Sequence, residues 1–195
     1  MNQHIEIEFK NILTKQQYEN LLEAFSVQAS QIHRQTNHYF DTAEQHLKKL
    51  SSALRIREIG DTIECTLKEK KGPNEHLETT DFITFADAQK MLAGEEITAP
   101  SVRAQLQLFD VPLKDLQPFG TLTTDRVEIP YKGGLLVFDH SFYLQCDDYE
   151  VEYETNDEKI GKKVFSEFLH NYNIEPHAAQ KKIVRFMMAL DNQKG

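Results

Sequence analysis

The sequence predicts an α+β fold built on an eight-stranded antiparallel β-barrel, with helices packed outside it. Eight runs of residues have strand-like character, and several neighbouring runs are joined by short turns. Four longer segments are amphipathic with helical periodicity, and their apolar faces need a surface to cover. We expect a single domain over residues 1–195, because a chain of this length can bury a substantial core.

The strand-like runs favour antiparallel hairpins. The sequence IGDT at 59–62 and the sequence KGG at 132–134 both predict tight turns, in which glycine supplies the backbone freedom that a turn requires. Few of the strands have signs of a protected edge, and closure into a barrel removes exposed edges. The expected strands are 3–10, 31–41, 52–60, 62–70, 76–84, 120–130, 134–145 and 147–155.

Helices are predicted where apolar residues recur every three or four positions. Thr14 is a plausible cap for the first helix, Gly94 a stop for the second, and Pro176 lies in the first turn of the last. The expected helices are 14–25, 84–94, 158–172 and 176–190, with a shorter one at 99–108.

Composition and charge exclude several classes of function. The formal net charge is −9, which argues against binding along a nucleic-acid backbone but is compatible with a local basic pocket. No apolar run approaches the roughly 18 residues of a membrane span, and the first residues do not resemble a signal peptide. The two cysteines, Cys65 and Cys146, lack metal-type spacing. We therefore expect a cytoplasmic protein with two reduced packing thiols.

Charged and apolar residues alternate strictly in the stretch HIEIEFKNI at 4–12. Glu6, Glu8 and Lys10 share one face of a strand, and three apolar side chains share the other. Such a face is either solvated or directed into a site. The pattern recurs in four further strands, through Arg55 and Arg57, through Glu64, Thr66, Lys68 and Lys70, through Arg126 and Glu128, and through Glu150, Glu152 and Glu154.

Amphipathic helices favour the inward interpretation. If helices cover the apolar strand faces, the charged faces must point into the lumen of the barrel. Grouped carboxylates there would repel one another unless a cation lay between them, and grouped Lys and Arg would attract a multivalent anion. Carboxylates, a divalent metal and basic residues together are typical of a site for a chain of phosphates.

The order of these motifs resembles the CYTH superfamily, also called triphosphate tunnel metalloenzymes. EIEFK at 6–10 contains the ExExK signature of that family, which is weak evidence when it stands alone. Within that family, the chain resembles the small bacterial triphosphatases of the YjbK type. The matching motifs are NHYFDT at 37–42, LRIR at 54–57, TLK at 66–68, TDR at 124–126, VFD at 137–139, YEVEYE at 149–154 and KIVRF at 182–186.

The resemblance implies a tunnel with a charged lumen, in which basic residues and divalent cations hold a triphosphate. Catalytic roles then fall to Glu6, Glu8 and Lys10. The implied metal ligands are Glu6, Glu8, Glu150, Glu152 and Asp139, and Glu78 would support them. The implied phosphate contacts are Lys10, Arg55, Arg57, Lys68, Arg126, Lys182 and Arg185, the last being alternatively a surface partner.

The expected activity is metal-dependent hydrolysis of triphosphates, with Mg²⁺ or Mn²⁺ as cofactor. Inorganic triphosphate is the substrate that the resemblance favours. Three alternatives stay open: a thiamine triphosphatase, an enzyme like the class IV adenylate cyclases, and a non-catalytic sensor of a phosphate-rich ligand or nucleotide. The expected partner is a small-molecule triphosphate, with no nucleic acid and no membrane. The sequence is compatible with a monomer and with a homodimer.

Overall fold

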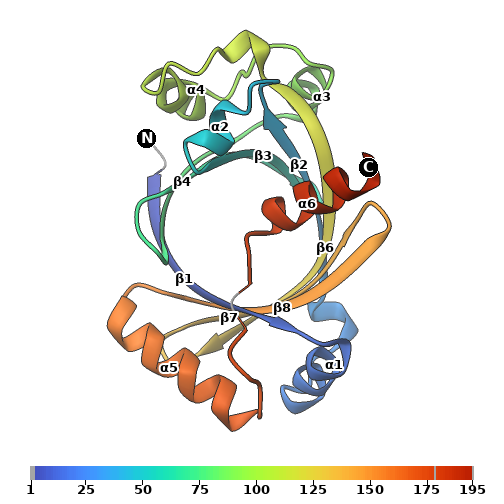
Figure 1. The fold of residues 1–195 in the computed structure, drawn as a ribbon, viewed down its shortest axis with the longest axis vertical. Coiled ribbons are helices and arrows are strands. Elements are labelled where there is room, and N and C mark those ends of the chain that lie inside the picture. The colour runs from blue at the N-terminus through green and yellow to red at the C-terminus, as the bar shows by residue number, and fades with distance from the viewer. Residues whose placement is uncertain (1–2, 178, 195) are drawn as a thin grey trace. The chain divides into compact units, whose positions relative to one another are not determined.

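The computed structural model describes residues 3–177 and 179–194. Its eight strands close into an antiparallel barrel, as predicted, in the hydrogen-bonded order β1-β5-β4-β3-β2-β6-β7-β8. Every strand lies within a few residues of its predicted position. The strands, labelled in Figure 1, are β1 (Gln3–Leu13), β2 (His33–Asp41), β3 (Ser52–Ile59), β4 (Thr62–Lys70), β5 (Glu75–Phe82), β6 (Gln117–Tyr131), β7 (Gly134–Tyr143) and β8 (Cys146–Thr155).

The helices also follow the predicted segments, with two differences. The helices are α1 (Lys15–Ala24), α2 (His46–Lys49), α3 (Phe85–Leu92), α4 (Pro100–Gln107), α5 (Glu158–Asn171) and α6 (Lys182–Lys194). Helix α2 was not expected, because four residues are too short for periodicity to reveal. Among the described residues, no helix is long and apolar enough to cross a membrane.

The last helix begins later than the sequence predicts. A helix over 176–190 was expected, with Pro176 in its first turn, but α6 starts at Lys182. The reason is a contact that is distant in sequence. Residues Glu175 and His177 are hydrogen-bonded to Asn11 of β1, and Ile12 N donates to the carbonyl of His177 at 3.1 Å. These bonds hold the segment against β1 and prevent helix formation there.

Contacts divide the chain into two compact units. Unit 1 comprises Met1–Ile5 and Gln35–Leu122, and unit 2 comprises Glu6–Arg34 and Thr123–Gly195. The expectation of one domain over 1–195 stays a prediction. The core of unit 1 lies between one face of β2, β3 and β4 and the helices α3 and α4. Its buried residues include Phe40, Leu54, Ile56 and Leu67 from strands and Ala88, Met91, Val102 and Leu106 from helices.

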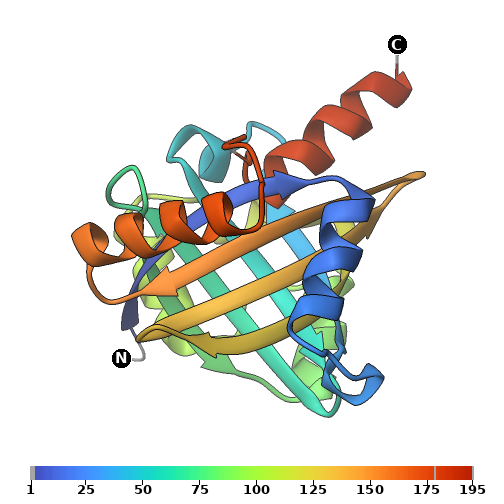
Figure 2. The same cartoon turned by 90° about the horizontal axis from the view of Figure 1, so that it is seen from below.

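Unit 2 has the same arrangement, with α1 and α5 lying across the outer face of its strands (Figure 2). Helix α5 approaches closely because it carries Gly161, where an added Cβ would lie 2.4 Å from Thr155 Cγ2 and 2.8 Å from Phe9 Cε2. The core includes Phe9, Val127, Phe138, Val151 and Tyr153 from strands and Tyr18, Leu21, Phe165 and Phe168 from helices.

The strand polarity is inverted relative to that of a half-solvated sheet. On β1, Phe9 packs against Phe165 of α5 with ring centroids 6.1 Å apart, so its neighbours Glu8 and Lys10 point to the opposite face. On β3, Leu54 and Ile56 are fully buried in the core of unit 1. The apolar faces therefore pack under helices, as the inward interpretation predicts.

Of the two cysteines, Cys65 is buried as a packing thiol, whereas Cys146 is exposed. The expectation of two packing thiols is therefore wrong for Cys146.

Candidate functional site

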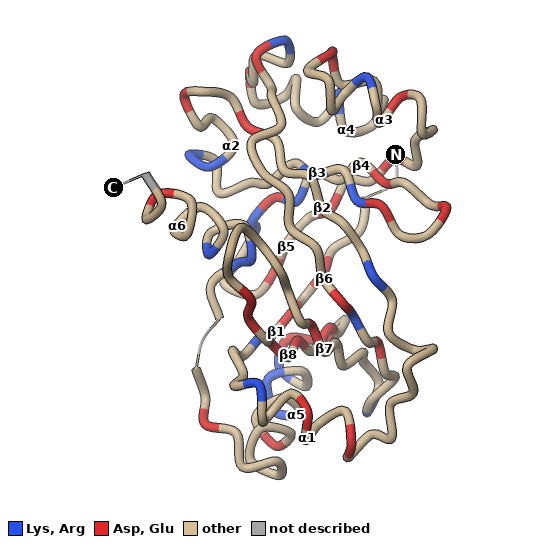
Figure 3. The backbone as a smooth tube through the Cα atoms, turned by 90° about the vertical axis from the view of Figure 1, so that its right-hand side faces the viewer, with Lys and Arg blue, Asp and Glu red and all other residues tan. Residues whose placement is uncertain are grey.

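Three buried carboxylates gather on β7 and β8 of unit 2. Asp139, Glu150 and Glu152 are at most 4% exposed, and one oxygen from each lies within 4.8 Å of the others. Strand pairing places them together, because Asp139 lies directly opposite Glu150 and Glu152 follows two residues later on the same face. Figure 3 shows acidic positions grouped along these strands. We call these three residues the acidic cluster.

Arg126 of β6 neutralises part of this cluster. It lies opposite Asp139 in the strand pairing, and its Nε and Nη2 donate to the Asp139 carboxylate at 2.8 and 2.6 Å. Nη2 also donates to Glu152 at 3.1 Å. Burial alone would raise the pKa of Asp139, but Arg126 and Lys182 lower it below its ordinary value. Asp139 is therefore held as a carboxylate in a buried position.

Lys182, at the start of α6, lies among all three carboxylates. Its Nζ is 2.8 Å from Asp139 and 3.0 Å from Glu152, and it also contacts Glu150. Burial lowers the pKa of Lys182 to about 7, and Arg126 and Lys10 oppose the raising effect of Asp139. The amine occupies the position at which the three carboxylates converge.

Arg185 lies one turn further along α6 and holds the helix to β8. Its Nε and Nη2 donate to the Asp148 carboxylate at 2.8 and 3.0 Å, and Nη2 donates to Glu150 at 2.5 Å. The Tyr143 hydroxyl donates to the same Asp148 carboxylate at 2.5 Å. Sequence reasoning missed Asp148. The signal was present, because Asp148 precedes Glu150 by two residues and so shares its face.

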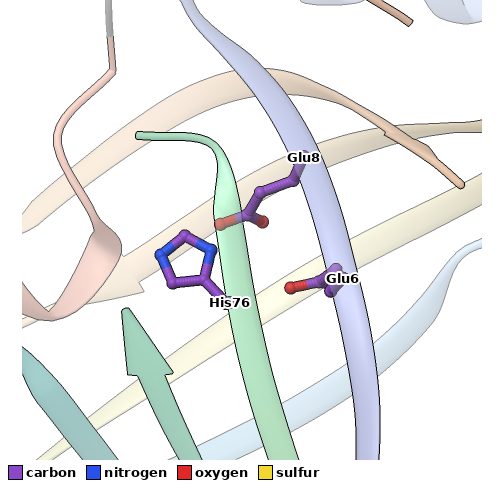
Figure 4. Close-up of side chains that lie close together, drawn as sticks. All are labelled: Glu6, Glu8 and His76. Carbon is purple, nitrogen blue, oxygen red and sulfur yellow. The ribbon is translucent and has the colours of Figure 1, made fainter. Parts of the chain in front are cut away.

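The ExExK motif on β1 contributes to the same group. Lys10 lies opposite Glu152 in the strand pairing, and its Nζ is 3.1 Å from Glu152 and 3.2 Å from Glu8. Burial alone would lower the pKa of Lys10, but Glu152 and Glu8 raise it above its ordinary value. Figure 4 shows Glu6 and Glu8 on β1; Glu8 is buried and Glu6 half-buried. The alternating pattern thus places the motif beside the acidic cluster.

Unit 1 carries a second charged group with the opposite balance. Arg55 and Lys68 lie 3.7 and 3.3 Å from Glu78, and Arg57 Nε donates to Asn37 Oδ1 at 2.8 Å. We call Arg55, Arg57 and Lys68 the basic cluster. Lys68 is paired directly with Glu78 across β4 and β5. Burial alone would raise the pKa of Glu78, but Arg55, Lys68 and Arg57 lower it to about 2.

The predicted residues therefore fall into two groups that each unit assembles by itself. In unit 2 the structure brings together Glu8, Lys10, Arg126, Asp139, Glu150, Glu152, Lys182 and Arg185, with Glu6 on the same face of β1. In unit 1 it brings together Arg55, Lys68 and Glu78, with Arg57 close enough to lower the Glu78 pKa. The roles assigned to these residues stay predictions.

The acidic cluster has the chemistry of a divalent-cation site. Its donors are all carboxylate oxygens, the ligands that Mg²⁺ and similar hard cations prefer, and metal–oxygen distances of about 2.0–2.6 Å match oxygens that lie within 4.8 Å of one another. The donor set therefore fits such an ion when the Lys182 amine moves out from between the three carboxylates. The basic cluster, in contrast, offers guanidinium and ammonium groups that suit phosphate oxygens.

Comparisons with known proteins agree with these features. The chain is 38% identical over 186 residues to the protein named "Putative triphosphatase YjbK" of Bacillus subtilis (strain 168), covering 95% of this chain and 96% of that protein. A solved structure described as a putative adenylate cyclase from Bacillus halodurans is 36% identical, with a TM-score of 0.91, covering 95% of this chain and 99% of that one.

A plant structure shows the same fold at lower identity. It is described as a putative adenylyl cyclase from Hippeastrum with a dominant triphosphatase activity, and it is 23% identical, with a TM-score of 0.80 and 95% of each chain covered. The model of the CYTH domain family matches residues 4–187, which is nearly the whole sequence. The chain therefore belongs to the CYTH domain family.

Proposed function

We propose that the protein is a metal-dependent triphosphatase that hydrolyses inorganic triphosphate. The observation that carries this proposal is the acidic cluster, in which three buried carboxylates converge beside Lys10 and Arg126. A protein that only bound an anion would have little use for buried carboxylates, which repel phosphate. The similarity to the Bacillus subtilis protein named "Putative triphosphatase YjbK" supports this proposal.

The proposed metal ligands are Glu6, Glu8, Asp139, Glu150 and Glu152, with Mg²⁺ or Mn²⁺ as the ion. When bound, such an ion supplies charge stabilisation at the phosphate oxygens and can lower the pKa of a bound water. Arg126 and Lys10 keep the carboxylates ionised and oriented, as their contacts to Asp139, Glu152 and Glu8 indicate.

The proposed phosphate contacts in each unit are the basic residues that the family resemblance implies. They are Lys10, Arg126, Lys182 and Arg185 from unit 2 and Arg55, Arg57 and Lys68 from unit 1. Phosphoryl transfer depends mainly on positioning and on electrostatic stabilisation of the charge that develops on the phosphate oxygens. Glu78 holds Arg55 and Lys68 in place through its own carboxylate. It is a positioning residue in this proposal.

The test is release of inorganic phosphate from triphosphate by the purified protein, with Mg²⁺, with Mn²⁺ and with a chelator. We expect release from tripolyphosphate with a divalent ion and none with the chelator. Thiamine triphosphate and ATP belong in the same panel, with cyclic AMP measured for ATP, because one solved relative is described as an adenylate cyclase. Tight binding of tripolyphosphate without release of phosphate would contradict the proposal and favour a sensor.

A further inference from the structure

The segment between α5 and α6 is attached to β1 by the side chain of Asn11 and by a backbone hydrogen bond. Asn11 Nδ2 donates to the carbonyl of Glu175 at 3.1 Å, and Asn11 Oδ1 accepts from His177 N at 2.5 Å. A backbone bond from Ile12 N to the carbonyl of His177, at 3.1 Å, continues this pairing. Asn11 therefore bridges the two sides of Pro176, six residues before α6 begins at Lys182.

The chemistry of this contact requires an amide. Asn11 is 2% exposed and lies on the same face of β1 as Phe9, away from Glu8 and Lys10. A carboxamide offers both donors and an acceptor, so it can serve a carbonyl and an N–H at the same time. Aspartate of the same size keeps the acceptor but loses the donors, and alanine loses both. The carbonyl of Glu175 would then lose the bond from Asn11.

The first turn of α6 is also held by its own side chains, beginning with Lys182 among the three carboxylates. Arg185 binds Asp148 and Glu150, and Phe186, which is 2% exposed, packs near Tyr143 with ring centroids 6.2 Å apart. Beyond this turn Met188 is 52% exposed, and the far end of α6 extends away from β8 (Figure 2). The attachment at Asn11 is a constraint on the chain just before Lys182.

We propose that Asn11 is a positioning residue that holds Lys182 within the acidic cluster, and so acts on triphosphate turnover through α6. The expected effect of Asn11 on turnover rests on the proposed function, whereas its expected effect on the position of α6 does not. Lys182 occupies the point at which Asp139, Glu150 and Glu152 converge. Its amine and a divalent cation therefore compete for the same oxygens, while the same amine is a proposed contact for phosphate.

This geometry gives opposite effects on the two ligands. Release of α6 removes a competing amine from the carboxylates, so the affinity for a divalent cation rises. The same release removes Lys182 and Arg185 from the phosphate chain, so triphosphate binds more weakly and its KM rises. A general loss of structure would instead weaken the binding of both ligands. The signs of the two changes therefore distinguish positioning from a role in folding.

The experiment compares Asn11→Asp and Asn11→Ala with the control Asn20→Ala. The control removes an exposed asparagine of α1 whose carbonyl oxygen accepts from Gln16 of the same helix at 2.9 Å. Hydrogen exchange is measured by mass spectrometry, and Mn²⁺ binding by calorimetry. We expect faster exchange confined to 182–190 and Mn²⁺ binding about ten-fold tighter in Asn11→Ala. The KM for tripolyphosphate should rise about ten-fold, with a smaller change in kcat.

Unchanged exchange over 182–190 in both Asn11 variants would overturn the proposal. So would faster exchange throughout unit 2, failure of the variants to fold, or weaker Mn²⁺ binding, because each would assign Asn11 to the general fold. If the protein hydrolyses no triphosphate, the exchange and Mn²⁺ results still decide the role of Asn11. The failure of the proposed function is thus separable from the failure of this inference.

Discussion

The two units carry the same strand pattern with opposite chemical results. In both, apolar residues pack under helices and charged residues occupy the other face of the sheet. In unit 2 the carboxylates of Asp139, Glu150 and Glu152 converge, and basic residues surround them. In unit 1 three basic residues are accompanied by the carboxylate of Glu78.

In both units the inverted polarity of the strands decides where a charged group forms. The sign of the charge on the alternating residues decides which ions that group can bind. β8 alternates glutamates, so its charged face collects cations, here Lys10, Arg126 and Lys182. β3 alternates arginines, so its charged face suits anions. The pKa shifts agree with this contrast, because basic neighbours lower the pKa of Glu78 to about 2 in unit 1, whereas Glu152 and Glu8 raise the pKa of Lys10 in unit 2.

The largest effect is expected from Glu152→Gln in the acidic cluster. Glu152 contacts Lys10, Arg126 and Lys182, and it is one of the three converging carboxylates. Loss of its charge should lower metal-dependent phosphate release about 100-fold or more, measured with tripolyphosphate and Mn²⁺. The matched control is Glu19→Gln on the exposed face of α1. Full turnover by the Glu152 variant would show that hydrolysis does not depend on the acidic cluster.

A smaller effect is expected from Arg57→Met in the basic cluster. Arg57 binds Asn37 and helps to lower the pKa of Glu78, so it belongs to the anion-binding face of unit 1. We expect the KM for tripolyphosphate to rise about ten-fold, because one charge-assisted contact is lost, while Mn²⁺ affinity stays the same. Arg103→Met on α4, where Arg103 pairs with Glu96, is the control. An unchanged KM would show that Arg57 does not contact phosphate.

A third expected effect is on the stability of the fold, and it depends on pH. The pKa of Glu78 falls from 4.5 to about 2 on folding, so its contribution is complete above pH 4.5 and is lost as the pH falls toward 2. This shift corresponds to about 3 kcal/mol of unfolding free energy. Glu78→Gln should remove that dependence, measured by denaturant unfolding at pH 2 to 6. Parallel curves for the variant and the wild type would show that Glu78 is not held by these basic groups.

Much of the fold could be predicted because its determinants are local. Alternation placed all eight strands, and it correctly put Phe9 under a helix and Glu8 on the opposite face. The same alternation identified the charged residues of β1, β3, β4, β6 and β8, whereas Glu78, Asp139, Lys182 and Arg185 were implied only by the family resemblance. The pairing across strands was not predicted; the structure shows that Lys68 faces Glu78 and Asp139 faces Glu150.

The features that sequence reasoning missed depend on distant contacts. The start of α6 was wrong because Asn11, far away in the chain, holds Glu175 and His177 in a non-helical conformation. Glu69 extends the apolar face of β4 and is nevertheless 3% exposed, because Lys71 and Gln105 of α4 bind its carboxylate at 2.8 and 2.9 Å. No periodicity in the sequence reports such a partner.

The most direct test of the central contrast is a crossed titration of Glu152→Gln and Arg57→Met. Mn²⁺ affinity is measured without triphosphate, and tripolyphosphate affinity is measured in chelator, so that no turnover occurs. We expect Glu152→Gln to lose affinity for Mn²⁺ and to keep its affinity for tripolyphosphate. Arg57→Met should lose affinity for tripolyphosphate and keep its affinity for Mn²⁺. Equal losses of both ligands in both variants would contradict the assignment of cation binding to the acidic cluster and of anion binding to the basic cluster.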